Sequence, residues 1–212
     1  PVRESYRKFI FQLRKDGFNE LITKFPVFGR FIVSTIILWQ HNSEEMICRI
    51  SNDRIILEKQ FNIPRNIALS KVKQGLSDPH RGGKAVAIIE FISTNNCSHK
   101  LVYKPKDMGV DIAYQNALKD LNSYDPANPL RTLSIYSGQD YGYMEFVHHR
   151  LAKDQVELEN FYYNSGRLTA ILHLLGCTDC HHENLIACGD QLLLIDTETL
   201  LEADVPDHND PE

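Results

Sequence analysis

The sequence predicts an α+β protein in which helices precede an antiparallel sheet, and further helices and a short hairpin follow it. Two observations indicate this class. Apolar residues recur every three or four positions up to about residue 60, and β-rich runs separated by Gly, Pro, Asn and Asp begin at about 67. We therefore expect a helical segment (1–66), a first lobe built on the sheet (67–147) and the start of a second lobe (148–212).

Composition limits the classes of partner. Hydrophobic residues make up 42% of the 212 residues, enough for a packed core, and the net charge is −5. That charge gives no general attraction to nucleic acid, so we expect no nucleic-acid partner. The longest apolar run, 31–39, is shorter than the roughly 20 residues of a membrane helix. We predict that this run is buried core and that the chain has no membrane span.

The cysteines and the ends of the chain give two further expectations. Five cysteines, an odd number, occur without a signal sequence, so we expect a reducing cytoplasm in which the thiols stay free. The chain begins at Pro1 rather than at an initiator Met, and its last residues are polar. We therefore expect a segment cut from a longer protein.

In the first part, the apolar spacing is interrupted by Gly17, Pro26 and the polar cluster 41–43. This pattern is typical of helices that pack on the elements that follow them. We assign no chemistry to this part of the chain.

Three strands are expected next. Runs at 67–74 and 85–92 are separated by a segment that contains Gly82 and Gly83, which predicts a hairpin with a glycine tip. A third run, 100–104, follows a turn and is expected to pair antiparallel with the second. This strand ends in Lys104.

The remaining elements follow in order. A helix is predicted over 111–122, with Asp111 at the N-terminus, where a negative charge is favourable. Strands are expected at 132–136 and at 143–147, the second as a hinge between the lobes. Helices at 154–175, interrupted by Gly166, then precede a tight hairpin with strands at 185–188 and 191–195 and a Gly189-Asp190 turn.

Polar residues gather in the loop before this hairpin, in the pattern Asp-x-His-x-x-Asn. Asp179 can accept a proton from a hydroxyl, and the amide oxygen of Asn184 can bind Mg²⁺ together with Asp196, which ends the hairpin. His181 either holds the loop together or lies near a transferred phosphoryl group. Glu198 either adds a carboxylate to the metal site or does not, and the pattern leaves both readings open.

A zinc or redox interpretation of this loop is weaker. Cys177 and Cys180, followed by His181 and His182, have the spacing of half a zinc site. No second pair of ligands follows at a defined spacing, and the motif precedes a loop instead of opening a helix. We interpret the two cysteines as packing residues.

The order of these parts is more informative than any one of them. Lys104 alone could be an ordinary surface lysine, and Gly82 and Gly83 an ordinary turn. A glycine tip, a strand lysine, a helix, a hinge, an Asp-x-His-x-x-Asn loop and a hairpin ending in Asp form the order of parts in a kinase-type site. We therefore expect a two-lobed, kinase-like site that uses ATP and Mg²⁺.

Five strings in this order resemble the dehydratase domain of class II lanthipeptide synthetases (LanM), with coverage from near the N-terminus to about 203. They are Ser77–Val86 (SDPHRGGKAV), Val102–Lys106 (VYKPK), Tyr143–Phe146 (YMEF), Thr178–Ala187 (TDCHHENLIA) and Leu194–Leu200 (LIDTETL). The last two are the most specific.

The resemblance implies a lipid-kinase-like fold and a role in bacterial lantibiotic biosynthesis. In that family, ATP and Mg²⁺ are used to phosphorylate Ser and Thr of a ribosomal precursor peptide, which carries a leader. Phosphate is then eliminated to leave dehydroalanine or dehydrobutyrine. A separate C-terminal cyclase domain binds zinc and forms thioether rings, so zinc is expected only in a domain outside this chain.

The resemblance also implies roles for particular residues. Lys104 would contact the ATP phosphates with the glycine tip, Asp179 would be the hydroxyl base, and His181 would act in the same loop. Asn184 and Asp196 would bind Mg²⁺. The full set of implied site residues is Asp78, His80, Gly82, Gly83, Lys104, Asp179, His181, Asn184 and Asp196, with Asp78 and His80 expected near the phosphate and in the elimination step.

Some features depart from the family pattern. Ser77 stands where the family usually has Gly, and Lys84 where Arg is common, which puts the fit of this loop to phosphate in doubt. Because the chain ends soon after Asp196, we expect the isolated segment to be weakly active or inactive. Two alternatives stay open: a lipid- or protein-type kinase without elimination, and a non-catalytic kinase-fold module that binds a peptide. The presence of all four main site residues counts against the second.

Overall fold

The computed structural model describes residues 2–77, 79 and 82–201, which form two compact units. The first unit consists of the chain up to Ile55 together with the segment Ser77–Ala85, and the second unit consists of the rest. Each unit is described by itself.

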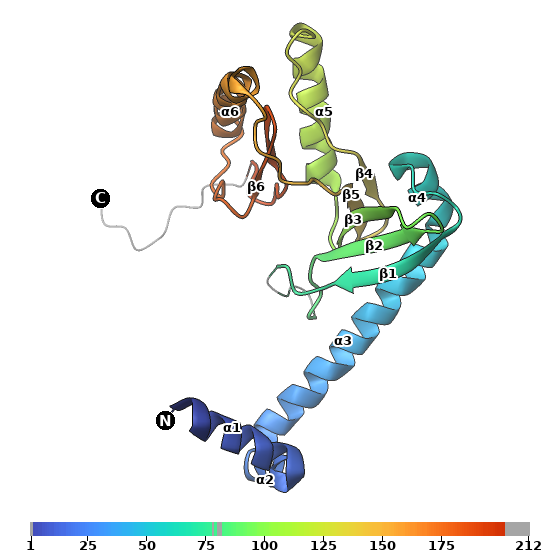
Figure 1. Ribbon diagram of the computed structural model, residues 1–212, viewed down its shortest axis with the longest axis vertical. Helices are drawn as coiled ribbons and strands as arrows, with labels where there is room; N and C mark the ends of the chain where they lie inside the picture. Colours follow the sequence, from blue (N-terminus) through green and yellow to red (C-terminus); the bar gives the residue numbers. More distant parts are fainter. Residues whose placement is uncertain (1, 78, 80–81, 202–212) are drawn as a thin grey trace. The chain divides into compact units, whose positions relative to one another are not determined.

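The first unit is helical, as the apolar spacing predicts. It contains α1 (Val2–Gln12), the π-helical turn η1 (Leu13–Gly17), α2 (Phe18–Lys24) and α3 (Pro26–Asn52). Pro26 lies in the first turn of α3, where its missing N–H leaves no helical hydrogen bond unmade. In Figure 1, α1 and α2 lie beside the N-terminal end of α3.

The prediction that 31–39 is buried core is wrong. Phe31 is 67% exposed and Trp39 is 61% exposed, and α3 buries only Gly29, Met46 and Ile50. The apolar run is sufficient for a helix, but burial also needs a second layer. Even Leu38, which lies beside Gly82 and Gly83, is 40% exposed. Among the described residues, no single helix is long and apolar enough to cross a membrane; α2 and α3 meet that requirement only jointly, with a bend of 116° between them.

The second unit begins within α4 (Arg54–Phe61) and contains a five-stranded antiparallel sheet in the order β1-β2-β3-β5-β4 (Figure 1). The strands are β1 (Ile67–Lys73), β2 (Ala87–Ser93), β3 (Ser98–Lys104), β4 (Ile135–Ser137) and β5 (Gly142–Glu145). The expected hairpin and the antiparallel third strand are confirmed, with Ile89 opposite Leu101. The register of β1 shifts between Leu69 and Lys71, which marks an irregularity in this edge strand.

The sheet buries alternate residues on one face. Ile89 and Phe91 of β2 and Tyr143 of β5 are completely buried, and Leu101 of β3 is nearly so. Gly142 lies at a close approach, because a Cβ at this position would be 2.3 Å from the Tyr136 carbonyl oxygen and 2.3 Å from Met108 Cγ. Only glycine fits there without displacement of β4 or of a buried side chain.

The rest of the unit packs around a second cluster of apolar residues. It contains α5 (Gly109–Tyr124), α6 (Gln155–Leu174), β6 (Leu185–Cys188) and β7 (Gln191–Leu194). The predicted helix at 111–122 and the predicted hairpin are confirmed. The core cluster joins both helices to β7 and comprises Tyr114, Leu118, Leu130, Leu168, Leu172, Leu194 and Leu200.

The predicted interruption at Gly166 is wrong, because α6 is one continuous helix of 20 residues. Glycine in a helix interior costs about 1 kcal/mol relative to alanine. Two features of α6 offset this cost. Asp154 caps the helix by accepting a hydrogen bond from the Glu157 N–H at 2.8 Å, and Leu168 and Leu172 are buried.

An α+β fold with an antiparallel sheet is thus confirmed. The division into kinase-type lobes at residues 66 and 147 stays a prediction.

Candidate active site

Lys104 and Asp111 form a buried ion pair in the second unit. The Lys104 Nζ lies 3.0 Å from Asp111 Oδ1, and the two side chains are 6% and 2% exposed. The same Nζ donates a hydrogen bond to the Ile195 carbonyl oxygen at 2.6 Å. Burial holds the pKa of Lys104 below its usual value, although the charge of Asp111 acts in the opposite direction. One ammonium group therefore ties the end of β3 to α5 and to the segment just before Asp196.

Lys106 bridges two carboxylates on that same segment. Its Nζ lies 3.0 Å from Asp196 Oδ1 and 2.7 Å from Glu198 Oε1. Burial acts to raise the pKa of Asp196, but Lys104 and Lys106 outweigh burial and hold it below the usual value. Asp196 is therefore ionised at neutral pH.

Thr197, between the two carboxylates, is buried. Its hydroxyl oxygen has no hydrogen-bond partner among the residues that the structure describes.

The Asp-x-His-x-x-Asn loop is held by its own side chains. The Asn184 amide nitrogen donates to Asp179 Oδ2 at 2.9 Å, and the His181 Nδ1 lies 2.8 Å from Asp179 Oδ1. The other His181 nitrogen, Nε2, lies 3.2 Å from Glu183 Oε2. The structure therefore brings Asp179, His181 and Asn184 together, and it places both hydrogen-bonding groups on the carboxylate that is predicted to act as base.

Backbone hydrogen bonds join this loop to the residues around Asp196. The Ile195 N–H donates to the Asn184 carbonyl oxygen at 2.9 Å, and the Asp179 N–H donates to the Thr199 hydroxyl at 3.2 Å. The candidate base and the two candidate metal ligands thus belong to one connected structure.

The donor set fits Mg²⁺, which prefers oxygen ligands. The amide nitrogen of Asn184 faces Asp179, so its oxygen is the atom suited to a metal ion. The Lys106 ammonium lies between Asp196 and Glu198 as a stand-in cation. Among the described residues, no group of three or more His, Cys, Asp or Glu side chains has the arrangement of a metal site.

The two cysteines of the loop lie side by side as free thiols. Cys177 and Cys180 are free thiols with their Sγ atoms 2.8 Å apart, and Cys177 also packs against the core cluster of the second unit. Burial and the neighbouring Cys177 raise the pKa of Cys180 to about 11. The Cys180 thiol is therefore protonated at neutral pH and is a weak nucleophile.

The glycine tip is held on α3 in the first unit. Gly82 and Gly83 have φ of +81° and +83°, a backbone conformation that glycine adopts without strain. Asn42 donates to the Gly82 carbonyl oxygen at 3.0 Å, and the Lys84 Nζ lies 2.6 Å from Glu45 Oε2. The candidates Asp78 and His80, in the same loop, lie outside the described residues.

The predicted site residues are therefore divided between the units. The glycine tip belongs to the first unit, and Lys104, Asp179, Asn184 and Asp196 belong to the second.

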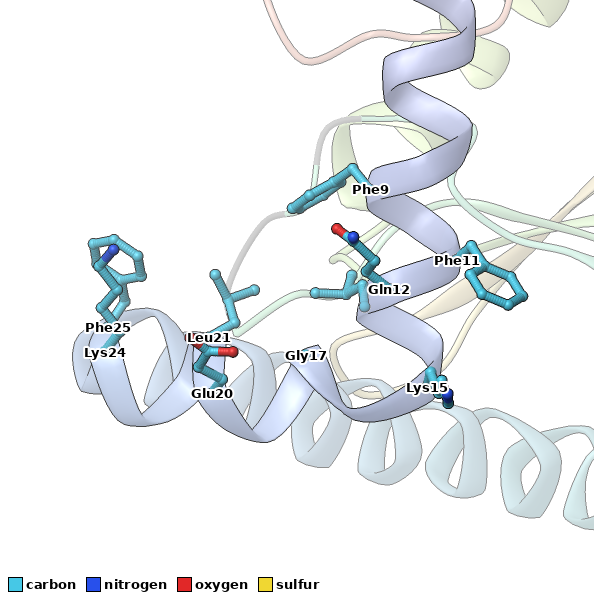
Figure 2. Close-up of a pocket in the computed structure, with 10 residues that line it drawn as sticks. Phe9, Phe11, Gln12, Lys15, Gly17, Glu20, Leu21, Lys24 and Phe25 are labelled. Carbon is cyan, nitrogen blue, oxygen red and sulfur yellow. The ribbon is translucent and has the colours of Figure 1, made fainter.

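A hollow of about 670 Å³ in the first unit contains none of these residues. It lies along α1, η1 and α2, where Phe9 and Gln12 extend from α1, Leu21 extends from α2, and Phe25 follows the end of α2 (Figure 2). The described residues that line it include no cluster of acid, base and metal ligands.

Two residues of the second-unit network were missed from the sequence. Asp111 was expected only to favour the start of a helix, but it is the partner of Lys104. Lys106 was given no role. Lys106 lies in the bend that follows β3, so strand alternation does not place its side chain, and its contacts with Asp196 and Glu198 depend on packing.

Comparison with known proteins shows the family to which the chain belongs. Residues 25–212 match the model of a family described as a domain of unknown function, DUF4135, and the chain belongs to that family. The chain is also 28% identical over 207 residues to the lacticin 481/lactococcin biosynthesis protein LcnDR2 of Lactococcus lactis subsp. lactis. This match covers 93% of the chain but 22% of that relative. The two matches confirm the resemblance to part of a class II lanthipeptide synthetase.

Proposed function

We propose that this chain is the nucleotide- and metal-binding part of a lanthipeptide dehydratase with a lipid-kinase-like fold. The enzyme would phosphorylate Ser and Thr of a ribosomal precursor peptide with ATP and then eliminate the phosphate. One observation carries the proposal: the connected network of Lys104, Asp111, Asp179, Asn184 and Asp196 in the second unit. The lacticin 481/lactococcin biosynthesis protein among its relatives supports the pathway.

In the kinase step, Lys104 would contact the ATP phosphates while Asp111 fixes its ammonium. Asp179 would accept the proton of the substrate hydroxyl, and the hydrogen bonds from His181 and Asn184 would orient its carboxylate. Asn184 and Asp196 would hold Mg²⁺, which neutralises charge on the phosphates when it is bound.

The elimination step needs a base for the α-proton and a positive group for the departing phosphate. We assign Asp78 and His80 to this step on the family resemblance. The proposal includes a cytoplasmic location, a leader-bearing precursor peptide as substrate, and a zinc-binding cyclase domain that acts after this one.

Intact-mass analysis of a precursor peptide that contains Ser, Thr and Cys tests the proposal. The peptide is incubated with Mg-ATP and the full-length protein that contains this segment. We expect ATP-dependent loss of water, and we expect Asp179→Asn to abolish it. Asp120→Asn, at an exposed position of α5, is the matched control and should leave it unchanged.

Other products would identify the alternatives. A stable phosphate without loss of water indicates a kinase that lacks elimination. An unmodified peptide that still binds indicates a non-catalytic module. Because the chain spans 22% of the length of the lacticin 481/lactococcin biosynthesis protein, we expect the 212 residues alone to dehydrate the peptide weakly or not at all, and efficient dehydration by them would contradict that expectation.

A further inference from the structure

The two carboxylates that follow β7 share one lysine. Asp196 and Glu198 are two residues apart, and both contact the Lys106 Nζ, at 3.0 and 2.7 Å. Thr197, between them, is buried. The segment therefore presents two negative charges on one side, with a single ammonium group between them.

The two lysines near this segment have different surroundings. Lys104 is buried and is held by Asp111 and by a backbone carbonyl. Lys106 is more open, at 23% exposure, and its carboxylate partners are 38% and 49% exposed. Water and ions can therefore reach the Lys106 contacts, and the flexible four-carbon stem of a lysine lets its ammonium move without a change of backbone.

We propose that Lys106 is a displaceable counter-ion of the metal site. In the absence of a divalent cation, its ammonium neutralises Asp196 and Glu198. When Mg²⁺ binds, the ammonium leaves these carboxylates and turns to the phosphates of the nucleotide. Lys106 is then a positioning residue that makes the binding of the metal and the binding of the nucleotide cooperative.

This role follows from charge. A divalent cation held by Asn184 and Asp196 would also be attracted by the neighbouring charge of Glu198, and it would interact with the two carboxylates more strongly than one ammonium does. The released ammonium would then be available to a phosphate charge of the nucleotide. Lys106 therefore weakens the binding of the metal alone and strengthens the binding of metal with nucleotide. Such coupling between two ligands is reciprocal.

The first test measures Mn²⁺ binding to the full chain without nucleotide, from the electron paramagnetic resonance signal of free Mn²⁺. Lys106→Met, which removes the charge but keeps most of the stem, is expected to raise Mn²⁺ affinity roughly tenfold, within the usual range of such couplings. Lys71→Met, at an exposed position of β1 in the same unit, is the matched control and should have no effect. An unchanged or lower affinity for Lys106→Met would overturn the proposal.

The second test measures Mg-ATP binding by calorimetry. Lys106→Met is expected to weaken it roughly tenfold, whereas Lys106→Arg should keep a large part of the affinity. Circular dichroism checks that each variant is folded. If Lys106→Met fails to fold, Lys106→Gln replaces it in both tests, and an increase in Mn²⁺ affinity is again required.

The inference rests on the proposed function, and Asp196→Asn separates the two. If Asp196→Asn leaves Mn²⁺ binding unchanged, the metal site itself is wrong. The other outcome is that Asp196→Asn abolishes Mn²⁺ binding while the separate variant Lys106→Met shows no increase in Mn²⁺ affinity. In that case the metal site is correct and the proposed role of Lys106 is wrong.

Discussion

The two units of this protein use apolar residues in different ways. α3 is 27 residues long and buries Gly29, Met46 and Ile50, whereas α5 buries four of its 16 residues, including Tyr114 and Leu118. Both helices have apolar residues at helical spacing. The difference teaches that this spacing predicts a helix, and that burial depends on whether another layer covers it.

One charged pair from each unit shows the two extremes of exposure. The Lys8–Glu4 pair of α1 is 76% exposed on both sides, while the Lys104–Asp111 pair is almost completely buried. An exposed pair contributes little to stability, whereas loss of one partner of a buried pair leaves a charge without a counter-charge. Loss of the Lys8–Glu4 pair should therefore be tolerated, whereas loss of one partner of the Lys104–Asp111 pair should not.

The largest effect is expected for Asp111→Ala. It leaves the buried ammonium of Lys104 without its carboxylate, and the free energy of unfolding should fall by about 4 kcal/mol. Urea unfolding followed by circular dichroism measures this change. Glu4→Ala, which removes the exposed pair of α1, is the control and should change it by less than about 0.5 kcal/mol. Equal effects of the two substitutions would remove the contrast between the units.

A smaller loss is expected for Gly142→Ala. The added Cβ would lie 2.3 Å from both the Tyr136 carbonyl oxygen and Met108 Cγ, and such overpacking should cost about 2 kcal/mol. Gly166→Ala is the matched control, because no atom lies within 4 Å of a Cβ there. Since Gly166 is inside a helix, the control should stabilise the protein by roughly 0.5 kcal/mol. A neutral Gly142→Ala would contradict the close approach of β4 and β5.

Thr197→Val is expected to raise stability by about 1 kcal/mol, because it replaces a buried hydroxyl that has no partner among the described residues with a methyl group of similar shape. The same urea experiment measures the change. Thr169→Val serves as control, since the Thr169 hydroxyl is exposed and bonded to the Ser165 carbonyl oxygen at 2.8 Å. A destabilised Thr197→Val would mean that this hydroxyl does have a partner.

The smallest effect is expected in the first unit, for Trp39→Ala. Trp39, the only tryptophan of the sequence, is 61% exposed, so its removal should change stability by less than about 0.5 kcal/mol. Phe91→Ala, at a completely buried position of β2, should cost about 4 kcal/mol. Acrylamide should quench Trp39 fluorescence nearly as well in the folded chain as in urea. Strong protection from acrylamide would show that α3 is covered.

The sequence predicted the elements of the second unit well. β1 and β2 are rich in Ile and Val, the turns before β3 and β7 contain Asn and Gly, and both features act over a few residues. The same local rules could not predict the exposure of Phe31 and Trp39, because exposure depends on distant parts of the chain. These local rules also predicted that α6 is interrupted at Gly166, whereas capping by Asp154 and the buried leucines maintain one continuous helix.

The site was predicted in part for a similar reason. The spacing of Asp179, His181 and Asn184 within one loop indicated that they could meet, and they do. The pairing of Lys104 with Asp111 and of Lys106 with Asp196 depends on how β3, α5 and β7 pack, which no short motif records. Roles for these residues in phosphoryl transfer stay predictions.

The register shift in β1 has a consequence for solubility. This strand forms one edge of the sheet, and a regular edge could recruit a strand from a second molecule. The irregularity between Leu69 and Lys71 interrupts the regular spacing of backbone groups along β1, and Lys71 and Lys73 add charge to the strand. The edge of the sheet is thereby protected against aggregation through strand pairing.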